Sequence, residues 1–148
     1  MTGELLPERL VVDTNVLVSE LLRRRGRQWL ARSSVLLFAS ERVDAEFRYE
    51  LERRLRAVGE RGSVGTSTLT QMHAEALLLY RERVNILPAE QYAALEAAAS
   101  QRIPADPDDW PSVALALLLD CGLWTEDRDF FGCGLSVWQT AVLYGVSA

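Results

Sequence analysis

Lysine is missing from the 148-residue chain, and all 16 of its basic residues are arginine. Schiff bases, the P-loop that binds ATP and lysine-assisted aspartyl-phosphate sites all need an amine that this chain does not have. Histidine occurs once, as His73, within an apolar helical pattern. A Ser-His or Cys-His pair therefore has a single candidate base. These absences disfavour nucleophilic catalysis by side chains and leave the carboxylates as the main chemical groups.

Cysteine and long apolar runs are also scarce. Cys121 and Cys133 have no neighbouring Cys or His at zinc-ligand spacing, and a structural zinc site needs about four such ligands. No apolar run approaches the roughly 20 residues that cross a bilayer, and the first residues lack the pattern of a signal peptide. We therefore expect one domain over residues 1–148, in the cytoplasm, with no membrane segment and with reduced thiols.

Short apolar segments alternate with amphipathic ones along the chain. A helix after Ser40, with an apolar seam that reaches residue 58, precedes a glycine-rich loop at residues 59–65. Gly26 is expected to end the first helix. The predicted strands are residues 9–13, 35–39, 84–87, 123–125 and 135–138, and the other predicted helices are residues 16–24, 28–32, 66–83, 89–100 and 112–119. This alternation predicts an α/β fold with a mostly parallel sheet that is covered on both faces.

Acidic residues gather where the predicted strands end. They lie after strand one, in the helix after strand two, before the helix that leads into strand four, and after strand four: Asp13, Glu46 and Glu50, Asp108 and Asp109, Asp127 and Asp129. Ligands of open parallel sheets bind beyond the carboxyl ends of the strands, so we expect these groups at one edge. Their mutual repulsion calls for protonation or a bound cation. Carboxylates suit Mg²⁺ or Mn²⁺, and a metal-bound water would supply the missing nucleophile.

Each of these acids also has a purely structural interpretation. Asp13 could serve only to cap the helix that follows it, and Glu46 could form an ion pair with Arg42 or Arg53 on a solvated helix face. Asp108 or Asp109 could cap the next helix. As a ligand, Asp109 is favoured over Asp108, and the case for all of these acids depends on their shared placement in the predicted sheet.

Four segments, in order, resemble the motifs of PIN domains. LVVDTNVLVSELL is similar to the opening of that family, and SERVDAEFRYEL is similar to its second segment. DPDDWPSVALAL, followed by LWTEDRDF, resembles the third and fourth. The likeness covers residues 9–140. It implies a three-layer α/β/α fold with parallel strands in the order 3-2-1-4-5, and Mg²⁺- or Mn²⁺-dependent cleavage of RNA phosphodiesters.

The resemblance also assigns roles to residues. The implied metal ligands, which would carry the catalysis, are Asp13, Glu46, Asp109 and Asp127. Thr14 and Asn15 would orient the first carboxylate or its water, with Asp108 and Asp129 in support. The chain departs from the family where DDWP offers two aspartates and a proline in place of a single aspartate. The choice between Asp108 and Asp109 therefore stays open, and Glu50 is an alternative to Glu46.

Arginines and one tryptophan are the candidate contacts with RNA. Residues 1–61 hold 12 arginines against 10 acids, a net of +2, whereas residues 62–148 hold 4 against 11, a net of −7. A local basic patch can bind phosphates even when the whole chain is acidic. The first candidate patch is Arg23, Arg24, Arg25 and Arg27, and a second strip is Arg48, Arg53, Arg54 and Arg56. Solvated helix faces are the alternative for both. Trp110 flanks the acids and could stack on a base.

Three functions compete on this evidence. The first is a ribonuclease. Stand-alone PIN proteins of this length are often toxins, so the resemblance extends to an antitoxin protein and a second copy of the chain as partners. The second is a catalytically silent PIN-like module that binds protein or RNA, which the retained acids disfavour. The third is a phosphotransfer or phosphatase domain with Asp after strand one. The absence of lysine and of a DxDxT motif excludes it.

Overall fold

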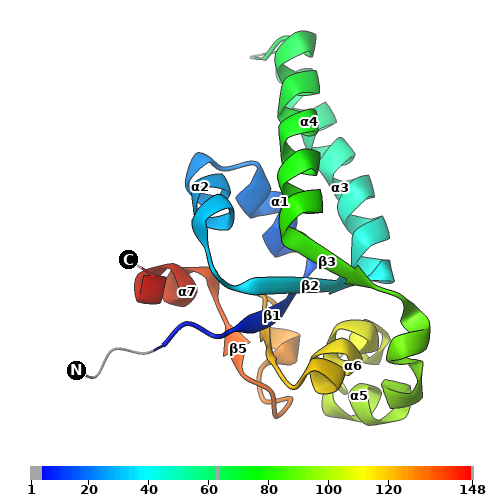
Figure 1. Cartoon of the computed structure of the whole chain (residues 1–148). Coiled ribbons are helices and arrows are strands. Elements are labelled where there is room, and N and C mark those ends of the chain that lie inside the picture. The colour runs from blue at the N-terminus through cyan, green and yellow to red at the C-terminus, as the bar shows by residue number, and fades with distance from the viewer. Residues whose placement is uncertain (1–4, 63, 148) are drawn as a thin grey trace.

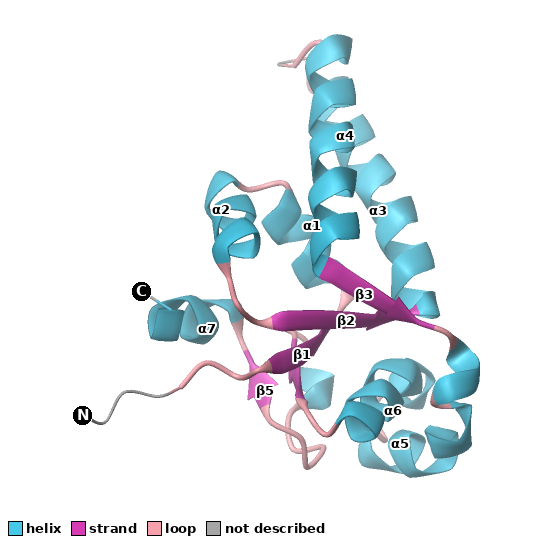
Figure 2. Cartoon of the chain, viewed as in Figure 1, coloured by secondary structure: helices cyan, strands magenta, loops and turns pink. Residues whose placement is uncertain are grey.

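A parallel sheet of five strands lies at the centre of the molecule (Figure 1, Figure 2). The structure, a computed structural model, describes residues 5–62 and 64–147. The strands are β1 (Arg9–Val12), β2 (Leu36–Ser40), β3 (Val84–Leu87), β4 (Gly122–Trp124) and β5 (Val137–Trp138). Their order is β3-β2-β1-β4-β5, and every pairing is parallel. The predicted fold class and strand order are confirmed.

Helices cover both faces of this sheet. They are α1 (Thr14–Leu21), α2 (Arg24–Arg32), α3 (Glu41–Glu60), α4 (Thr66–Arg83), α5 (Glu96–Arg102), α6 (Trp110–Leu119) and α7 (Thr140–Ser147). Alternate residues of β1 face opposite layers, as the two-residue period of a strand requires. Leu10 and Val12 belong to the core under α1–α4 and α7, and Val11 belongs to the core under α5 and α6. The molecule is therefore a three-layer α/β/α sandwich.

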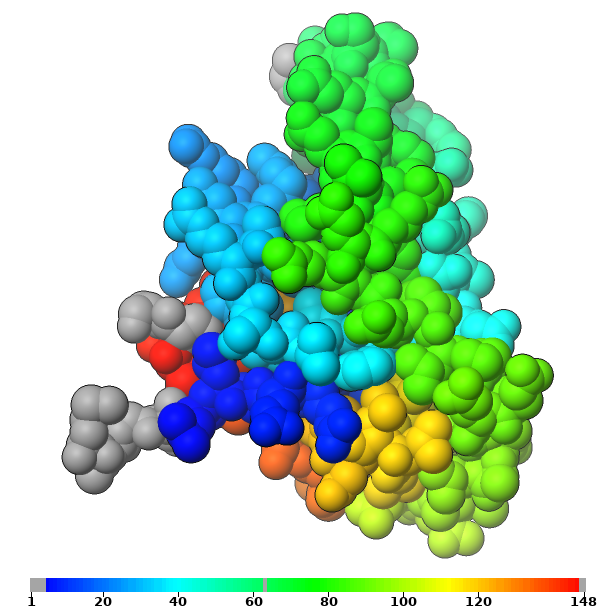
Figure 3. All heavy atoms as spheres, in the orientation of Figure 1, coloured from blue at the N-terminus to red at the C-terminus, as the bar shows by residue number. Residues whose placement is uncertain are grey.

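The antiparallel pair α3 and α4 forms an arm that stands out beyond the sheet (Figure 1, Figure 3). Ser40 caps α3 as predicted, since its side-chain oxygen accepts a hydrogen bond from the Val43 backbone N at 3.1 Å. The predicted seam of α3 is buried as far as Leu55 and half-buried at Val58, and the Phe47 ring stacks on Tyr80 of α4 with centroids 4.0 Å apart. None of the described helices is long and apolar enough to cross a membrane.

The prediction that Gly26 ends the first helix is wrong. α1 ends at Leu21, and Gly26 lies inside α2, buried against the backbone of α1. A Cβ atom at this position would lie 2.2 Å from the carbonyl oxygen of Glu20. Gly26 is therefore needed for close helix packing, which a sequence pattern cannot distinguish from helix breaking.

Other predicted boundaries also shift, and those of three segments are the largest or lie near the site. The segment predicted as one helix at residues 89–100 begins with two 3-10 turns, Ala89–Gln91 and Ala93–Leu95, before α5. α3 runs through Gly59 to Glu60, into the predicted loop. α6 begins at Trp110, with Pro111 in its first turn, where a missing N–H costs nothing. The last shift matters for the site because it places Asp109 directly at the start of α6.

Candidate active site

Four carboxylates line one small hollow beyond the carboxyl ends of β1 and β4. Its volume is about 90 Å³. The residues that line it are Asp13, Thr14, Asn15, Val43, Glu46, Asp109, Ser112, Asp127 and Phe130. The side chains implied as metal ligands thus share one space, although they come from segments far apart in the chain. Glu50, Asp108 and Asp129 are not among the lining residues.

Asp13 sits where β1 turns into α1. Its Oδ1 accepts a hydrogen bond from the Val16 backbone N at 3.1 Å, so it caps α1 as well as lining the hollow. Its Oδ2 accepts from the Thr125 hydroxyl. Burial raises the pKa of Asp13, the two hydrogen bonds lower it, and the charge of Asp127 raises it further. The capping and the functional interpretations of Asp13 are therefore compatible.

Thr125 connects the two acidic loops. Its hydroxyl donates to Asp13 and accepts a hydrogen bond from the Asp127 backbone N at 3.0 Å. The Asp127 side chain in turn accepts from the Asp129 backbone N at 2.9 Å, which closes a short turn after β4. One buried hydroxyl thereby fixes the positions of Asp13 and Asp127 relative to each other. Asp129 contributes its backbone N–H to this turn.

Glu46 reaches the hollow from the second turn of α3. Thr14 donates to its Oε2 at 3.1 Å, and the Arg42 Nε donates to its Oε1 at 3.0 Å. The ion pair with Arg42 is on the surface, since the Glu46 side chain is 48% exposed. Thr14 thus orients Glu46 and not Asp13. Asn15 accepts from the Arg54 guanidinium at 3.5 Å.

The Asp108 and Asp109 side chains have different surroundings. Asp109 lines the hollow, whereas Asp108 is exposed and offers its backbone carbonyl to Arg42. Burial, a hydrogen bond with Asp106 and the charge of Asp106 raise the pKa of Asp109 to about 6, and the charge of Asp127 adds to this. The geometry therefore favours Asp109 as the functional member of the pair.

The donor chemistry of the hollow fits a divalent cation. Its lining offers carboxylate, hydroxyl and amide oxygens and no basic side chain, which is what Mg²⁺ or Mn²⁺ requires. Burial is the main cause of the raised pKa values of Asp13 and Asp109, and the charges of neighbouring aspartates add to it, so a bound cation would favour their ionised forms. Among residues 5–62 and 64–147, no three His, Cys, Asp or Glu side chains are grouped closely enough to hold a metal ion. The lining residues are of the chemical types that bind such a cation, but they are spread around the hollow and are not grouped at one point.

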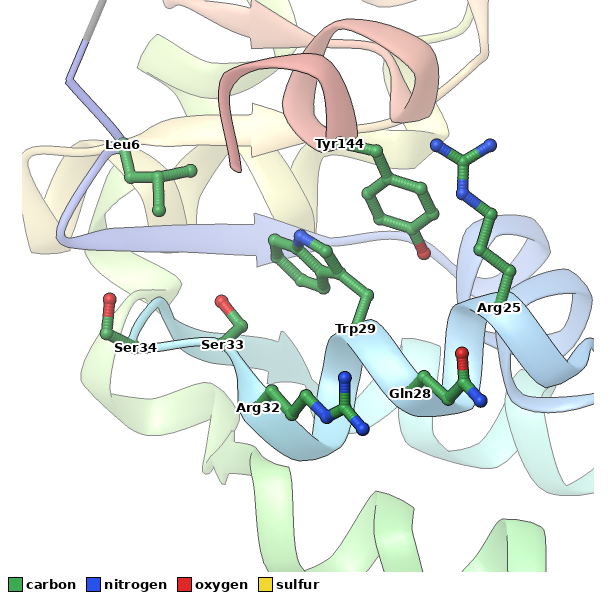
Figure 4. A pocket seen from close by; sticks show the side chains of 8 residues that line it. All are labelled: Leu6, Arg25, Gln28, Trp29, Arg32, Ser33, Ser34 and Tyr144. Carbon is green, nitrogen blue, oxygen red and sulfur yellow. The ribbon is translucent and has the colours of Figure 1, made fainter. Parts of the chain in front are cut away.

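The first arginine patch lies on α2. Arg23 contacts Glu20 at 3.7 Å, and Arg27 donates to the Leu21 carbonyl at 3.3 Å. Arg25 lies over the Tyr144 ring at 5.4 Å, at the edge of a pocket of about 450 Å³ (Figure 4). That pocket is also lined by Leu6 and Ser33, which precede β1 and β2. It therefore opens at the amino ends of the strands, away from the acidic hollow.

Sequence reasoning missed three polar residues of the site and misjudged one aromatic. Thr125 and Ser112 are buried next to the carboxylates, and Asp106 acts on Asp109. A hydroxyl at the end of β4, two residues before Asp127, was the available signal for Thr125. Trp110 packs against the Tyr92 ring with centroids 6.2 Å apart and does not line the hollow.

The comparisons agree with this geometry. No curated protein matches the chain. The sequence profile described as PIN domain matches residues 11–144, which include every residue that lines the hollow. Members of that family are generally nucleases and typically use a divalent metal. The chain therefore belongs to the PIN domain family.

Proposed function

We propose that the chain is a Mg²⁺- or Mn²⁺-dependent ribonuclease that cuts RNA phosphodiesters at the acidic hollow. The observation that carries the proposal is the meeting of Asp13, Glu46, Asp109 and Asp127 around one space. They come from four segments of the chain, and of the four only Glu46 has an ion pair among the described residues, so gathering them adds no stability to the fold. A site of this kind serves a ligand with positive charge.

A bound divalent cation would supply a water of lowered pKa and would shield the phosphate from the acids. Every other feature belongs to the chain. Asp13 is held by Thr125 and by the backbone of α1, and Glu46 is held by Thr14 and Arg42. These bonds fix the carboxylates before substrate arrives, which reduces reorganisation during the reaction. Burial and Asp106 raise the pKa of Asp109 to about 6 in the metal-free protein, so binding of a cation would release its proton.

The test is cleavage of single-stranded RNA by purified protein. Activity should require Mg²⁺ or Mn²⁺ and stop in EDTA. Asp13→Asn, Glu46→Gln and Asp109→Asn should each lower the rate by about 100-fold or more while the fold survives, because each removes a charged oxygen from the hollow. Asp108→Asn is the matched control, since its exposed side chain does not line the hollow.

Two results would contradict the proposal. Cleavage that persists in EDTA would point to a contaminant or to metal-independent chemistry. Equal rates for the wild type and Asp13→Asn would exclude the hollow as the site of reaction. Full activity of Asp109→Asn with loss of activity in Asp108→Asn would exchange those two roles and leave the mechanism in place.

The finer expectations stay predictions. They are the antitoxin partner, the homodimer, the cytoplasmic location, and RNA contact through Arg23, Arg24, Arg25 and Arg27. A short reading frame encoding a DNA-binding protein directly beside this one would favour the toxin role. The silent-module alternative predicts RNA binding that is unchanged by EDTA and is never followed by cleavage.

A further inference from the structure

A groove between α1 and α3 adjoins the acidic hollow. Its volume is about 310 Å³, and Thr14, Asn15 and Glu46 line both spaces. The other residues that line the groove follow one another along α3: Tyr49, Glu50, Arg53 and Arg54. A polymer that is bound in the hollow and extends in this direction would run along α3 towards the tip of the α3–α4 arm (Figure 1).

The electrostatic character changes between the hollow and the groove. The hollow is lined by acids without a basic partner in its lining. Along α3, Glu46 is paired with Arg42 at 3.0 Å, and Glu50 is paired with Arg53 at 2.8 Å. These pairs offset the repulsion that the two carboxylates would exert on a polyanion. The groove can therefore accept phosphate without a metal ion.

Of the two arginines that line the groove, Arg53 is paired with Glu50, and Arg54 forms no ion pair with a described residue. Its Nη1 donates to the Ser19 hydroxyl at 3.1 Å and its Nη2 to Asn15 Oδ1 at 3.5 Å. Both hydrogen-bond partners are neutral, and the nearby Glu50 carboxylate, whose pKa the charge of Arg54 helps to lower, is already paired with Arg53. The planar guanidinium is therefore fixed, and further N–H donors stay available to an anion. Arg54 follows Glu46 by about 12 Å along the helix axis. It is placed to bind a backbone phosphate other than the one that is cut.

Tyr49 adds an aromatic surface to the same groove. Its side chain is 67% exposed, although large aromatic groups are usually buried. Base–aromatic stacking tolerates any sequence because every base has a π-face. The groove volume is near the lower end of the range of about 300–1,000 Å³ for small-ligand sites. Stacking on Tyr49 needs an unpaired base, so the groove favours a single strand over a duplex.

We propose that the groove between α1 and α3 binds the single-stranded RNA next to the cleaved bond, with Arg54 on a backbone phosphate and Tyr49 stacked on a base. This inference rests on the proposed ribonuclease function for its substrate. It goes beyond that function by assigning the path of the strand and two residues that the acidic site does not contain.

The experiment measures binding of a fluorescein-labelled oligouridylate, of about ten nucleotides, to the full chain in EDTA, where no cleavage occurs. Arg54→Gln should weaken binding about tenfold and lower the slope of log affinity against log salt by about 0.7. Tyr49→Ala should weaken binding about fivefold or more, and Tyr49→Phe should restore it. Arg56→Gln is the matched control on the same helix, since Arg56 lines a different pocket with His73.

Each outcome decides between the two proposals. Equal losses for Arg54→Gln and Arg56→Gln would overturn the groove and leave only diffuse attraction by α3. If the wild type binds in the expected pattern but never cuts RNA with Mg²⁺ or Mn²⁺, the groove stands and the ribonuclease proposal fails. If the wild type cuts RNA but the variants bind as tightly as the wild type, the ribonuclease proposal stands and the groove proposal fails. If it neither binds nor cuts, both are overturned. Should Arg54→Gln fail to fold, the exposed Tyr49 pair decides alone.

Discussion

Thr125 acts on the site through its hydrogen bonds to both acidic loops. Replacing it with valine keeps the volume and removes the bond that lowers the pKa of Asp13. We expect Thr125→Val to lower the rate of RNA cleavage about 10- to 100-fold, as the loss of a group that orients a metal ligand usually does. The acid limb of the pH–rate profile should move to higher pH, because Asp13 then loses its proton less readily.

A merely structural role for Thr125 would move the melting temperature but not the pH profile. The control is Thr70→Val, because Thr70 is exposed on α4 and its hydroxyl bonds only to its own helix. An unchanged acid limb in Thr125→Val would show that the hydroxyl does not set the ionisation of Asp13.

Asp109 makes the stability of the metal-free protein depend on pH. Its pKa is raised from 3.8 to about 6, mainly by burial and then by the charge of Asp106. Between these values the folded protein holds a proton that the unfolded chain has released. This contribution therefore favours folding at low pH and is lost as the pH rises through about 6.

Asp109→Asn should accordingly raise the melting temperature in EDTA at about pH 7.5, and by much less at about pH 4, close to the pKa of the unfolded chain. Differential scanning fluorimetry across this range measures the difference. Asp108→Asn is the control, because its side chain is exposed. A pH-independent difference for Asp109→Asn would show that the charged carboxylate is not penalised in the folded state.

Individual residues also show which parts of the site could be predicted from the sequence. Asp13, Glu46 and Asp127 were predictable because each follows a strand whose apolar character is plain. Thr125 was not singled out, since its contact with Asp13 depends on the register of β1 and β4, which pairs Val12 with Trp124. Register follows from the packing of the whole sheet and not from local pattern.

Among the elements, α1 and α2 show how one atom can decide packing. Gly26 lets α2 approach the backbone of Glu20, where an added Cβ would lie at 2.2 Å. Gly26→Ala should destabilise the fold by about 1–3 kcal/mol, as overpacking does. Gly145→Ala is the matched control within a helix, since its Cβ would meet nothing within 4 Å. It should be neutral or stabilise by up to about 1 kcal/mol.

Urea unfolding of both variants measures the two free energies. Equal effects would mean that α2 can shift away from α1 at no cost, and the interpretation of Gly26 as a packing residue would fail. The same pair of helices shows a limit of sequence patterns. A glycine between two apolar stretches indicates a break, and only the neighbouring helix reveals that the residue serves close contact.

At the scale of the whole molecule, the acidic hollow and the pocket beside Arg25 are divided between opposite ends of the sheet. The acids lie at the carboxyl ends of the strands, and the pocket that holds Arg25 opens at the amino ends. This division was only partly predictable. The acids follow strand ends directly, so the fold places them. The arginines lie on helices whose position along the sheet depends on the turn between α1 and α2.

Metal binding should stabilise the whole fold, because the unfolded chain cannot hold the carboxylates together. At about 100 times the dissociation constant, a ligand bound only by the folded protein adds about 2.7 kcal/mol. Mn²⁺ should therefore raise the melting temperature of the wild type, and Asp13→Asn should abolish most of that shift. Mg²⁺ should act in the same direction.

The control for this prediction is Asp120→Asn, the same change at an acid that lies at the opposite end of α6 from Asp109 and does not line the hollow. Asp120 has a φ of 51°, a left-handed conformation that asparagine adopts readily, so the substitution should leave the fold intact. Its melting temperature should rise with Mn²⁺ as much as that of the wild type. If Asp13→Asn also kept the full rise, the cation would be bound elsewhere on this acidic surface, and the hollow would lose its assigned role.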